Sequence, residues 1–337
     1  MRYRVLLAPL LLVALVPRSA GAQASPTDEP VFRVNVRVEV VDAQVISKKT
    51  RQVISSLQRE DFEVYEDNVR QEISAFSQDE LPMSIVFLFD LTDSVRPVLR
   101  SLAEGAREVL QHLRPQDEVA VMVYAASAKL LQESTTDPTL AAAAIEKASR
   151  MQSNEAAFFN EGIFQASVQL GHTKDPASRR VVIWLTDDVP NIPSEETRSS
   201  LGRSVPEGKL HSEKEALIQV LKTGTVVCTL LKKSEISERE ESARTPAKIA
   251  GSMLYPPGEV YKYARATGGQ VVEASAKKMK ARIAQLIDDL RMRYSLSYHP
   301  AAEKPKGKFC VIKVKLVPQV RKSQDGLLIE AKQGYYR

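Results

Sequence analysis

The chain has 337 residues, of which 43% are hydrophobic and 26% are charged, so it can bury the core of an ordinary globular protein of two domains. Three of its 47 basic residues, Arg2, Arg4 and Arg18, lie in an N-terminal stretch without acidic residues. Removal of that stretch leaves 44 basic against 42 acidic residues. This near-neutral balance, without interleaved aromatic and basic residues, excludes a nucleic-acid-binding surface.

The N-terminus has the pattern of a secretory signal peptide. Arg2 and Arg4 precede the apolar stretch 5–16, and Ala20-Gly21-Ala22 has the small-residue spacing of a cleavage site. The apolar stretch is short for a membrane span, and Pro9 interrupts it. We therefore expect an exported protein, periplasmic or extracellular, with no transmembrane segment after cleavage.

A short β segment follows a polar linker over residues 23–31. From Phe32 to Val40, apolar residues alternate with polar ones, which is typical of a half-buried antiparallel strand. Two more short strands are predicted at Phe62–Tyr65 and Glu72–Phe76. Because three strands are too few to be stable alone, we expect residues 32–80 to pair with another part of the chain.

From Leu81 onward, buried strands alternate with amphipathic helices. This order predicts an α/β fold class, a doubly wound and mostly parallel sheet with helices on both faces, over residues 81–291. The predicted strands are Ile85–Phe89, Val119–Tyr124, Val181–Leu185, Thr225–Leu231 and Val271–Val272. The predicted helices are 98–113, Pro138–Ala148, Asn160–Leu170, Ser212–Leu221, Glu259–Ala266 and Ala276–Arg291.

The C-terminal residues return to strand character, at Tyr294–Tyr298, Phe309–Val317 and Leu327–Ala331. Neither flank has enough strands to bury a core of its own. We therefore expect residues 292–337 to pair with residues 32–80 in a smaller β-sandwich-like domain, into which the α/β domain is inserted. The predicted order is completed by a signal peptide at 1–22 and the linker at 23–31.

The chain has two cysteines, Cys228 and Cys310, and an even number in an exported protein permits a disulfide. Both lie in apolar strand-like runs, where cysteine behaves as a small hydrophobic residue. The sequence leaves both possibilities open.

A candidate site lies where the strand Ile85–Phe89 ends. Asp90 follows directly, and Thr92 and Ser94 come at alternate positions after it. Open α/β sheets place ligands at this edge, and hard oxygen atoms there suit Mg²⁺, Mn²⁺ or Ca²⁺ rather than zinc. The alternative is that Thr92 and Ser94 only cap the following helix.

Asp187 follows another buried strand, so it lies at the same edge as Asp90 if the two strands are neighbours. Two carboxylates in one cleft repel each other unless a cation lies between them. The pattern favours a divalent cation, Mg²⁺ before Mn²⁺ or Ca²⁺, bound by Asp90, Thr92, Ser94 and Asp187. The alternative is that Asp187 and Asp188 only cap the turn that they begin.

The Asp-x-Thr-x-Ser spacing resembles the metal-ion-dependent adhesion site, Asp-x-Ser-x-Ser, of von Willebrand factor type A domains. The order of segments over nearly the whole mature chain resembles the acidobacterial VWFA-related family of exported proteins. The segments are REDFEVYEDNVRQEISAF, LPMSIVFLFDLTDS, WLTDD, ATGGQVVEA, LRMRYSLSYHP and the final KQGYYR. The resemblance implies a type A domain with an adhesion or assembly role. A cation bound there would be completed by a carboxylate of the partner protein.

The chain departs from the family pattern in the metal loops. Thr92 replaces serine, Asp93 and Asp188 stand where glycine is common, and Ala157 stands where the resemblance implies a threonine ligand. Auxiliary oxygen atoms could come from Asp93, Asp188, Asn154 and Glu155. Because Ala157 has no ligand atom, a metal-free scaffold for complex assembly is the alternative function.

A third hypothesis is a metal-dependent hydrolase built on Asp90, Asp187 and Asp188. Against it, these loops contain no histidine base, and the chain has neither a Gly-rich phosphate loop nor a G-x-S-x-G turn. We therefore expect a protein that is not an enzyme and that binds another protein through an acidic side chain of the partner.

Overall fold

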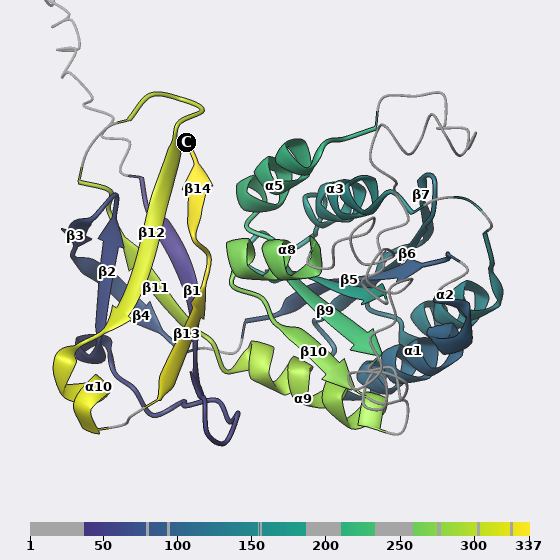
Figure 1. Ribbon diagram of the computed structural model, residues 1–337, viewed down its shortest axis with the longest axis horizontal. Coiled ribbons are helices and arrows are strands. Elements are labelled where there is room, and N and C mark those ends of the chain that lie inside the picture. The colour runs from purple at the N-terminus through teal and green to yellow at the C-terminus, as the bar shows by residue number, and fades with distance from the viewer. Residues whose placement is uncertain are drawn as a thin grey trace, which may run out of the picture. The chain divides into compact units, whose positions relative to one another are not determined.

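In the computed structural model of the protein, the continuous apolar runs form a mostly parallel sheet and the alternating segments form antiparallel sheets (Figure 1). The structure describes residues 37–78, 81–92, 95–153, 155, 157–186, 210–232, 259–274, 278–301, 304–323 and 326–337. The predicted signal peptide, the linker and the first residues of the strand predicted from Phe32 lie outside this part of the chain. Residues 37–337 group as one unit and are described as such.

The continuous apolar runs form a six-stranded sheet in the order β10-β9-β8-β5-β6-β7. Its strands are β5 (Met83–Asp90), β6 (Glu118–Tyr124), β7 (Ala128–Thr135), β8 (Arg179–Thr186), β9 (Val226–Lys232) and β10 (Val271–Ala274). Neighbours are parallel except β7, which pairs with β6 in the antiparallel sense. Every residue of β5 and β6 is buried, as expected for strands covered on both faces.

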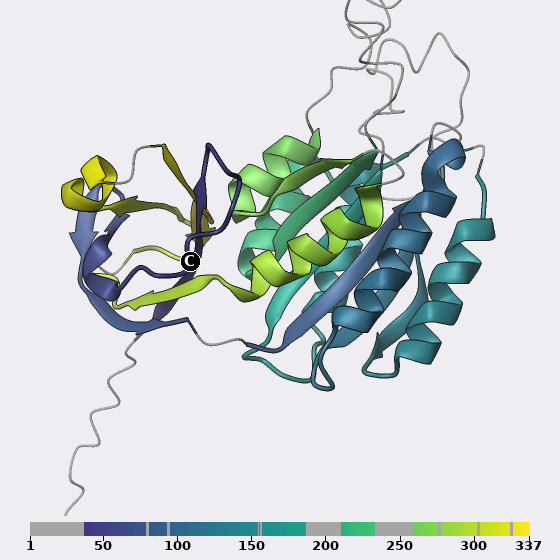
Figure 2. The same cartoon turned by 90° about the horizontal axis from the view of Figure 1, so that it is seen from below.

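Helices cover both faces of this sheet (Figure 2). They are α1 (Arg96–Val109), η2 (Leu110–His112), α2 (Pro138–Arg150), α3 (Phe159–Leu170), α5 (Glu213–Lys222), α8 (Glu259–Thr267) and α9 (Met279–Arg291). Helices α1, α2 and α9 share one core with Phe87 and Phe89 of β5. Helices α3, α5 and α8 share the other core with Val86 and Leu88, because alternate residues of a strand face opposite sides.

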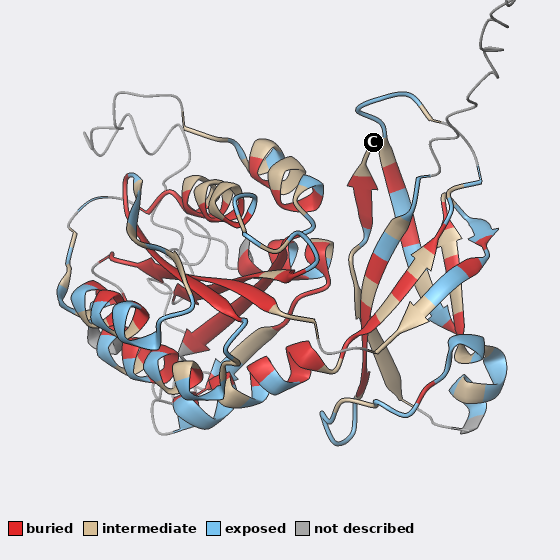
Figure 3. Ribbon diagram, turned by 180° about the vertical axis from the view of Figure 1, so that it is seen from behind, coloured by how far each residue is buried: buried red, intermediate tan, exposed pale blue. Residues whose placement is uncertain are grey.

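The alternating segments form two four-stranded antiparallel sheets, β13-β1-β11-β4 and β14-β12-β2-β3. Buried residues alternate with partly buried ones along β2 and β11 (Figure 3). The strands and helices of this β domain are β1 (Glu39–Ser47), η1 (Arg59–Asp61), β2 (Phe62–Glu66), β3 (Val69–Gln71), β4 (Ile73–Ser77), β11 (Tyr294–Tyr298), β12 (Phe309–Leu316), α10 (Pro318–Ser323), β13 (Leu327–Ala331) and β14 (Gly334–Tyr336).

Strands from the two ends of the described chain pair with each other. Val41 of β1 lies opposite Leu296 of β11, and Val45 lies opposite Ile329 of β13. Strand β2 pairs with β12 in the other sheet. The predicted fold class is confirmed: a mostly parallel α/β sheet with helices on both faces and a smaller β domain built from both flanks. The exact domain boundaries stay a prediction.

Both cysteines are buried free thiols, Cys228 in β9 and Cys310 in β12. They lie in the cores of different domains. Burial raises the pKa of Cys228 to about 11, so its thiol stays protonated at neutral pH. In the described part of the chain, cysteine therefore acts as a small hydrophobic residue.

Candidate functional site

Three neighbouring strands of the six-stranded sheet end together at its carboxyl edge. Asp90 is the last residue of β5 and lies opposite Tyr124, the last residue of β6. On the other side of β5, Thr186 is the last residue of β8 and follows Leu185, the partner of Phe89. The parallel register therefore brings the carboxylate of Asp90 and the hydroxyl groups of Tyr124 and Thr186 to one point.

Each carboxylate oxygen of Asp90 accepts two hydrogen bonds. Oδ1 accepts them from the backbone N–H of Thr92 (2.9 Å) and from its hydroxyl (2.7 Å). Oδ2 accepts them from the hydroxyls of Tyr124 (2.9 Å) and Thr186 (2.9 Å). The oxygen of Tyr124 in turn accepts a hydrogen bond from the indole N–H of Trp184 at 2.8 Å.

All four of these donors are neutral, and Asp90 is fully buried. Burial raises the pKa of Asp90 above its ordinary value, and the hydrogen bonds from Thr92, Thr186 and Tyr124 offset this effect only in part. The carboxylate is therefore held in one orientation by groups that do not neutralise its charge.

The structure brings together two of the four predicted ligands, Asp90 and Thr92, which is 1% exposed. Ser94 and Asp187 lie outside the described residues, and so do the auxiliary candidates Asp93, Asp188 and Asn154. Glu155 is exposed, and its carboxylate accepts a hydrogen bond from the Ser153 hydroxyl at 3.3 Å.

The loop before α3 is bonded to this edge at two points. The N–H of Ser153 donates to the carbonyl of Leu91 (3.1 Å), and the N–H of Phe158 donates to the carbonyl of Ala125 (3.0 Å). Between them Ala157 is fully buried in the apolar cluster that contains Tyr124 and Trp184. The loop therefore contributes a methyl group where the family resemblance implies a threonine oxygen.

Sequence reasoning missed Tyr124, Thr186 and Trp184 as parts of this site. Their pattern identified them only as members or neighbours of buried strands. A positional signal was nevertheless available for two of them. Tyr124 ends one predicted strand and Thr186 directly follows another, so both belong to the same edge as Asp90.

The oxygen atoms at this edge fit a hard divalent cation, because such cations prefer carboxylate and hydroxyl oxygen ligands. A hydroxyl that donates its proton to a carboxylate still carries lone pairs that can bind a cation. Thr92 fits as a ligand, with Asp90 as the compensating charge behind it. In the described residues no three His, Cys, Asp or Glu side chains form a metal-binding group.

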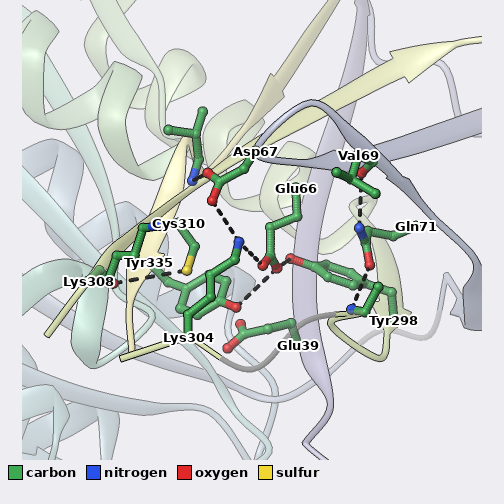
Figure 4. Close-up of polar contacts among 12 residues, drawn as sticks. Glu39, Glu66, Asp67, Val69, Gln71, Tyr298, Lys304, Lys308, Cys310 and Tyr335 are labelled. Carbon is green, nitrogen blue, oxygen red and sulfur yellow. Dashed lines mark hydrogen bonds and ion pairs between the residues drawn. The ribbon is translucent and has the colours of Figure 1, made fainter. Parts of the chain in front are cut away.

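The β domain contains a second buried carboxylate, Glu66, at the end of β2 (Figure 4). Its Oε1 accepts a hydrogen bond from the ammonium of Lys304 (2.6 Å), which also pairs with Asp67 (2.6 Å). Its Oε2 accepts hydrogen bonds from the hydroxyls of Tyr298 (2.7 Å) and Tyr335 (3.0 Å). Burial raises the pKa of Glu66, but the hydrogen bonds from Lys304, Tyr298 and Tyr335 outweigh it and hold the pKa below its ordinary value.

The partners of Glu66 come from both sheets of the β domain. Tyr298 belongs to β11, whereas Tyr335 belongs to β14, in the same sheet as β2. The cluster therefore links the two sheets, and an ammonium group balances its charge. These features indicate a structural role.

Residues 85–189 match the family model of the von Willebrand factor type A domain. This match identifies residues 85–189 as such a domain; the resemblance to the acidobacterial family stays a prediction. No curated protein matches the chain.

Among the helices of the described residues, none has both the length and the apolar character that a membrane span requires.

The chain is similar in fold to solved structures from several organisms. The conserved hypothetical protein BatB of Bacteroides thetaiotaomicron is 18% identical, with 62% of this chain and 98% of that chain covered and a TM-score of 0.43. A von Willebrand factor type A protein of Catenulispora acidiphila is 12% identical, with coverage of 90% and 75% and a TM-score of 0.44.

A third similar structure is proximal thread matrix protein 1 from the mussel byssus, with a zinc-occupied MIDAS motif. It is 14% identical, with 68% of this chain and 50% of that chain covered and a TM-score of 0.45. At these levels of similarity, the three structures carry no inference about what this chain binds.

Proposed function

We propose, from the von Willebrand factor type A domain at residues 85–189, that this is an exported, non-enzymatic protein that binds another protein. The binding edge is the carboxyl edge of the six-stranded sheet, and a divalent cation, Mg²⁺ in the first place, joins the two proteins there. The single observation that supports this proposal most is the fully buried Asp90 carboxylate, whose four hydrogen-bond donors among the described residues are all neutral.

In this proposal Thr92 holds the cation through its hydroxyl oxygen, while Asp90 orients that hydroxyl and supplies negative charge. Ser94 and Asp187 are the proposed remaining ligands. When bound, the cation would supply a coordination position for a carboxylate oxygen from an Asp or Glu of the partner. The residues around the edge would then select the partner by shape and charge.

Calorimetric titration of the chelator-treated mature protein with Mg²⁺, Mn²⁺ and Ca²⁺ tests this proposal. We expect saturable binding of at least one cation and at least a tenfold loss of affinity in Thr92→Val, which removes the hydroxyl and keeps the side-chain shape. Thr229→Val is the matched control. It makes the same change at a buried threonine of β9 whose hydroxyl has no hydrogen-bond partner, and it should bind as the wild type does.

A metal-free scaffold is the second candidate function, and a specific observation favours it. Ala157 is fully buried and apolar, so the loop before α3 adds no ligand from that position. If a folded wild-type protein binds none of the three cations, this candidate replaces the first. Its partner should then be retained on the protein in the presence of chelator.

The non-enzymatic part of the proposal has its own test. A phosphoester model substrate should be left intact by the pure protein with each of the three cations. Turnover that disappears in Asp187→Ala would contradict this part of the proposal and favour the hydrolase hypothesis.

A further inference from the structure

Tyr124 connects Asp90 to Trp184, the only tryptophan of the chain. A tyrosine hydroxyl has one proton to donate and lone pairs with which to accept. Here the proton points to Asp90 (2.9 Å), and a lone pair accepts the indole N–H of Trp184 (2.8 Å). All three residues are at most 1% exposed, so water does not compete for these bonds.

The ring of Tyr124 is fixed in place by tight packing. Phe159 and Trp184 both contact it edge to face, with ring centroids 6.0 Å and 6.4 Å away. On α3, Gly162 leaves room for the ring, because a Cβ atom there would lie 2.9 Å from Cγ of Tyr124. A ring held in this way presents its hydroxyl to Asp90 in one position.

Tyr124 and the loop that carries Ala157 are linked through the backbone and through one buried cluster. The loop is bonded to the residue directly after Tyr124, because the N–H of Phe158 donates to the carbonyl of Ala125. Ala157 and Tyr124 belong to one buried cluster, in which Ala157 contributes only a methyl group. Among the described residues, the hydroxyls that donate to Oδ2 of Asp90 come from Tyr124 of β6 and Thr186 of β8, and none comes from Ala157.

We infer that Tyr124 is a positioning residue of the candidate site, which supplies from β6 the hydroxyl that the loop at Ala157 lacks and couples the Asp90 carboxylate to the indole of Trp184. The cation part of this inference rests on the proposed function, whereas the coupling to Trp184 does not. Two consequences are measurable. A change at Asp90 alters the emission of Trp184, and loss of the Tyr124 hydroxyl weakens cation binding.

The first experiment uses the chelator-treated protein and reads the fluorescence of the single tryptophan. We expect Asp90→Asn to shift the emission maximum in the wild-type background and to leave it unchanged in the Tyr124→Phe background. Tyr263→Phe is the matched control: its ring also contacts Trp184 (6.1 Å), but its hydroxyl bonds to Asn160. The shift should persist in that background, and an equal shift in all three backgrounds overturns the coupling.

A second variant covers the case in which Tyr124→Phe folds poorly. Gly162→Ala places a Cβ atom against the ring of Tyr124, and it removes no hydrogen-bonding group from the protein. We expect it to reduce the emission shift caused by Asp90→Asn. An unreduced shift in a folded Gly162→Ala protein counts against the positioning role.

The second experiment is the cation titration of Tyr124→Phe and of Tyr124→Phe/Ala157→Thr. We expect at least a tenfold larger dissociation constant in the single variant and recovery of most of the lost affinity in the double variant, because a threonine at 157 adds a hydroxyl to the loop before α3. If the wild type binds a cation and Tyr124→Phe binds it equally well, the inference fails and the proposed function stands. If the wild type binds none, the proposed function fails, and the fluorescence experiment alone decides on Tyr124.

Discussion

Two of the buried carboxylates of the described residues, Asp90 and Glu66, have opposite electrostatic environments. Both lie at the end of a strand, and both accept hydrogen bonds from tyrosine hydroxyls. Glu66 also pairs with the ammonium of Lys304, and its pKa lies below the ordinary value. The donors to Asp90 in the part of the chain that the structure describes are all neutral, and burial keeps the pKa of Asp90 above its ordinary value.

The difference separates a structural carboxylate from one that is suited to a ligand. A buried charge without a compensating charge lowers the stability of the folded protein, so such a charge does not contribute to folding. Such a carboxylate can instead be compensated by a cation that binds later. If this interpretation is correct, the same chemical change should have unequal effects at the two positions.

The largest effect is expected from Glu66→Ala, which leaves two buried tyrosine hydroxyls without their acceptor and Lys304 without one of its two carboxylates. We expect a loss of about 3 kcal/mol in the free energy of unfolding. Glu63→Ala on the same strand, whose partner Arg70 is largely exposed, should cost no more than about 1 kcal/mol. Denaturant titration measures both, and equal losses would refute the structural role of Glu66.

A smaller loss is expected from Lys304→Met, which keeps most of the side-chain length and removes the charge. It should cost about 1.5 kcal/mol, because a hydrogen-bonded ion pair with a buried carboxylate is lost. Lys308→Met, at an exposed position of the same loop, serves as the control and should stay within about 0.5 kcal/mol of the wild type. If both lysine variants unfold alike, Glu66 does not depend on the ammonium.

The pH dependence of stability should distinguish the two carboxylates by sign. Because the pKa of Glu66 is lowered by folding, its contribution is present above its unfolded pKa of about 4.3 and is lost as the pH falls through the folded pKa. The pKa of Asp90 is raised by folding, so its contribution is present at low pH and is lost as the pH rises. Acid titration of unfolding should therefore become shallower in Glu66→Gln and steeper in Asp90→Asn; the reverse order would contradict the assignment.

The smallest effect is expected from Asp90→Asn in the presence of chelator. The hydroxyls of Tyr124 and Thr186 can rotate to accept from the new amide, and the uncompensated charge disappears. We expect the free energy of unfolding to stay within about 1 kcal/mol of the wild type, while the cation affinity is lost. A destabilisation as large as that of Glu66→Ala would show that Asp90 is also a structural carboxylate.

Much of the fold could be predicted from the sequence, because most elements bury a regular apolar pattern. Ile85–Phe89 became the centre of β5, and Pro138–Ala148 became most of α2. Strand β7 was missed, because it lies at the edge of the sheet, is half-exposed, and pairs with β6 through irregular register. Strand β14 was missed because three residues are too few for a pattern.

Of the candidate site, the sequence could predict only residues that lie just after the end of a predicted strand. Asp90 was found because a charged residue stands out after an apolar run. Tyr124 has an apolar ring that fits the core pattern, so nothing in the spacing revealed that its hydroxyl reaches across to the neighbouring strand. Contacts between strands depend on register, which the structure supplies and the spacing along one strand does not.

The pairing of β1 with β11 and β13 has a consequence for the order in which the protein forms. A chain is made from its N-terminus, so β1, β2 and β4 exist well before their C-terminal partners β11, β12 and β13, and the whole type A domain is synthesised in between. We expect that domain, whose parallel strands and helices all lie within its own stretch of chain, to form first. The backbone groups at the edges of the N-terminal strands therefore stay unpaired until β13 has been synthesised. A closed β domain is therefore attained only by a chain that has been completed through its last strands.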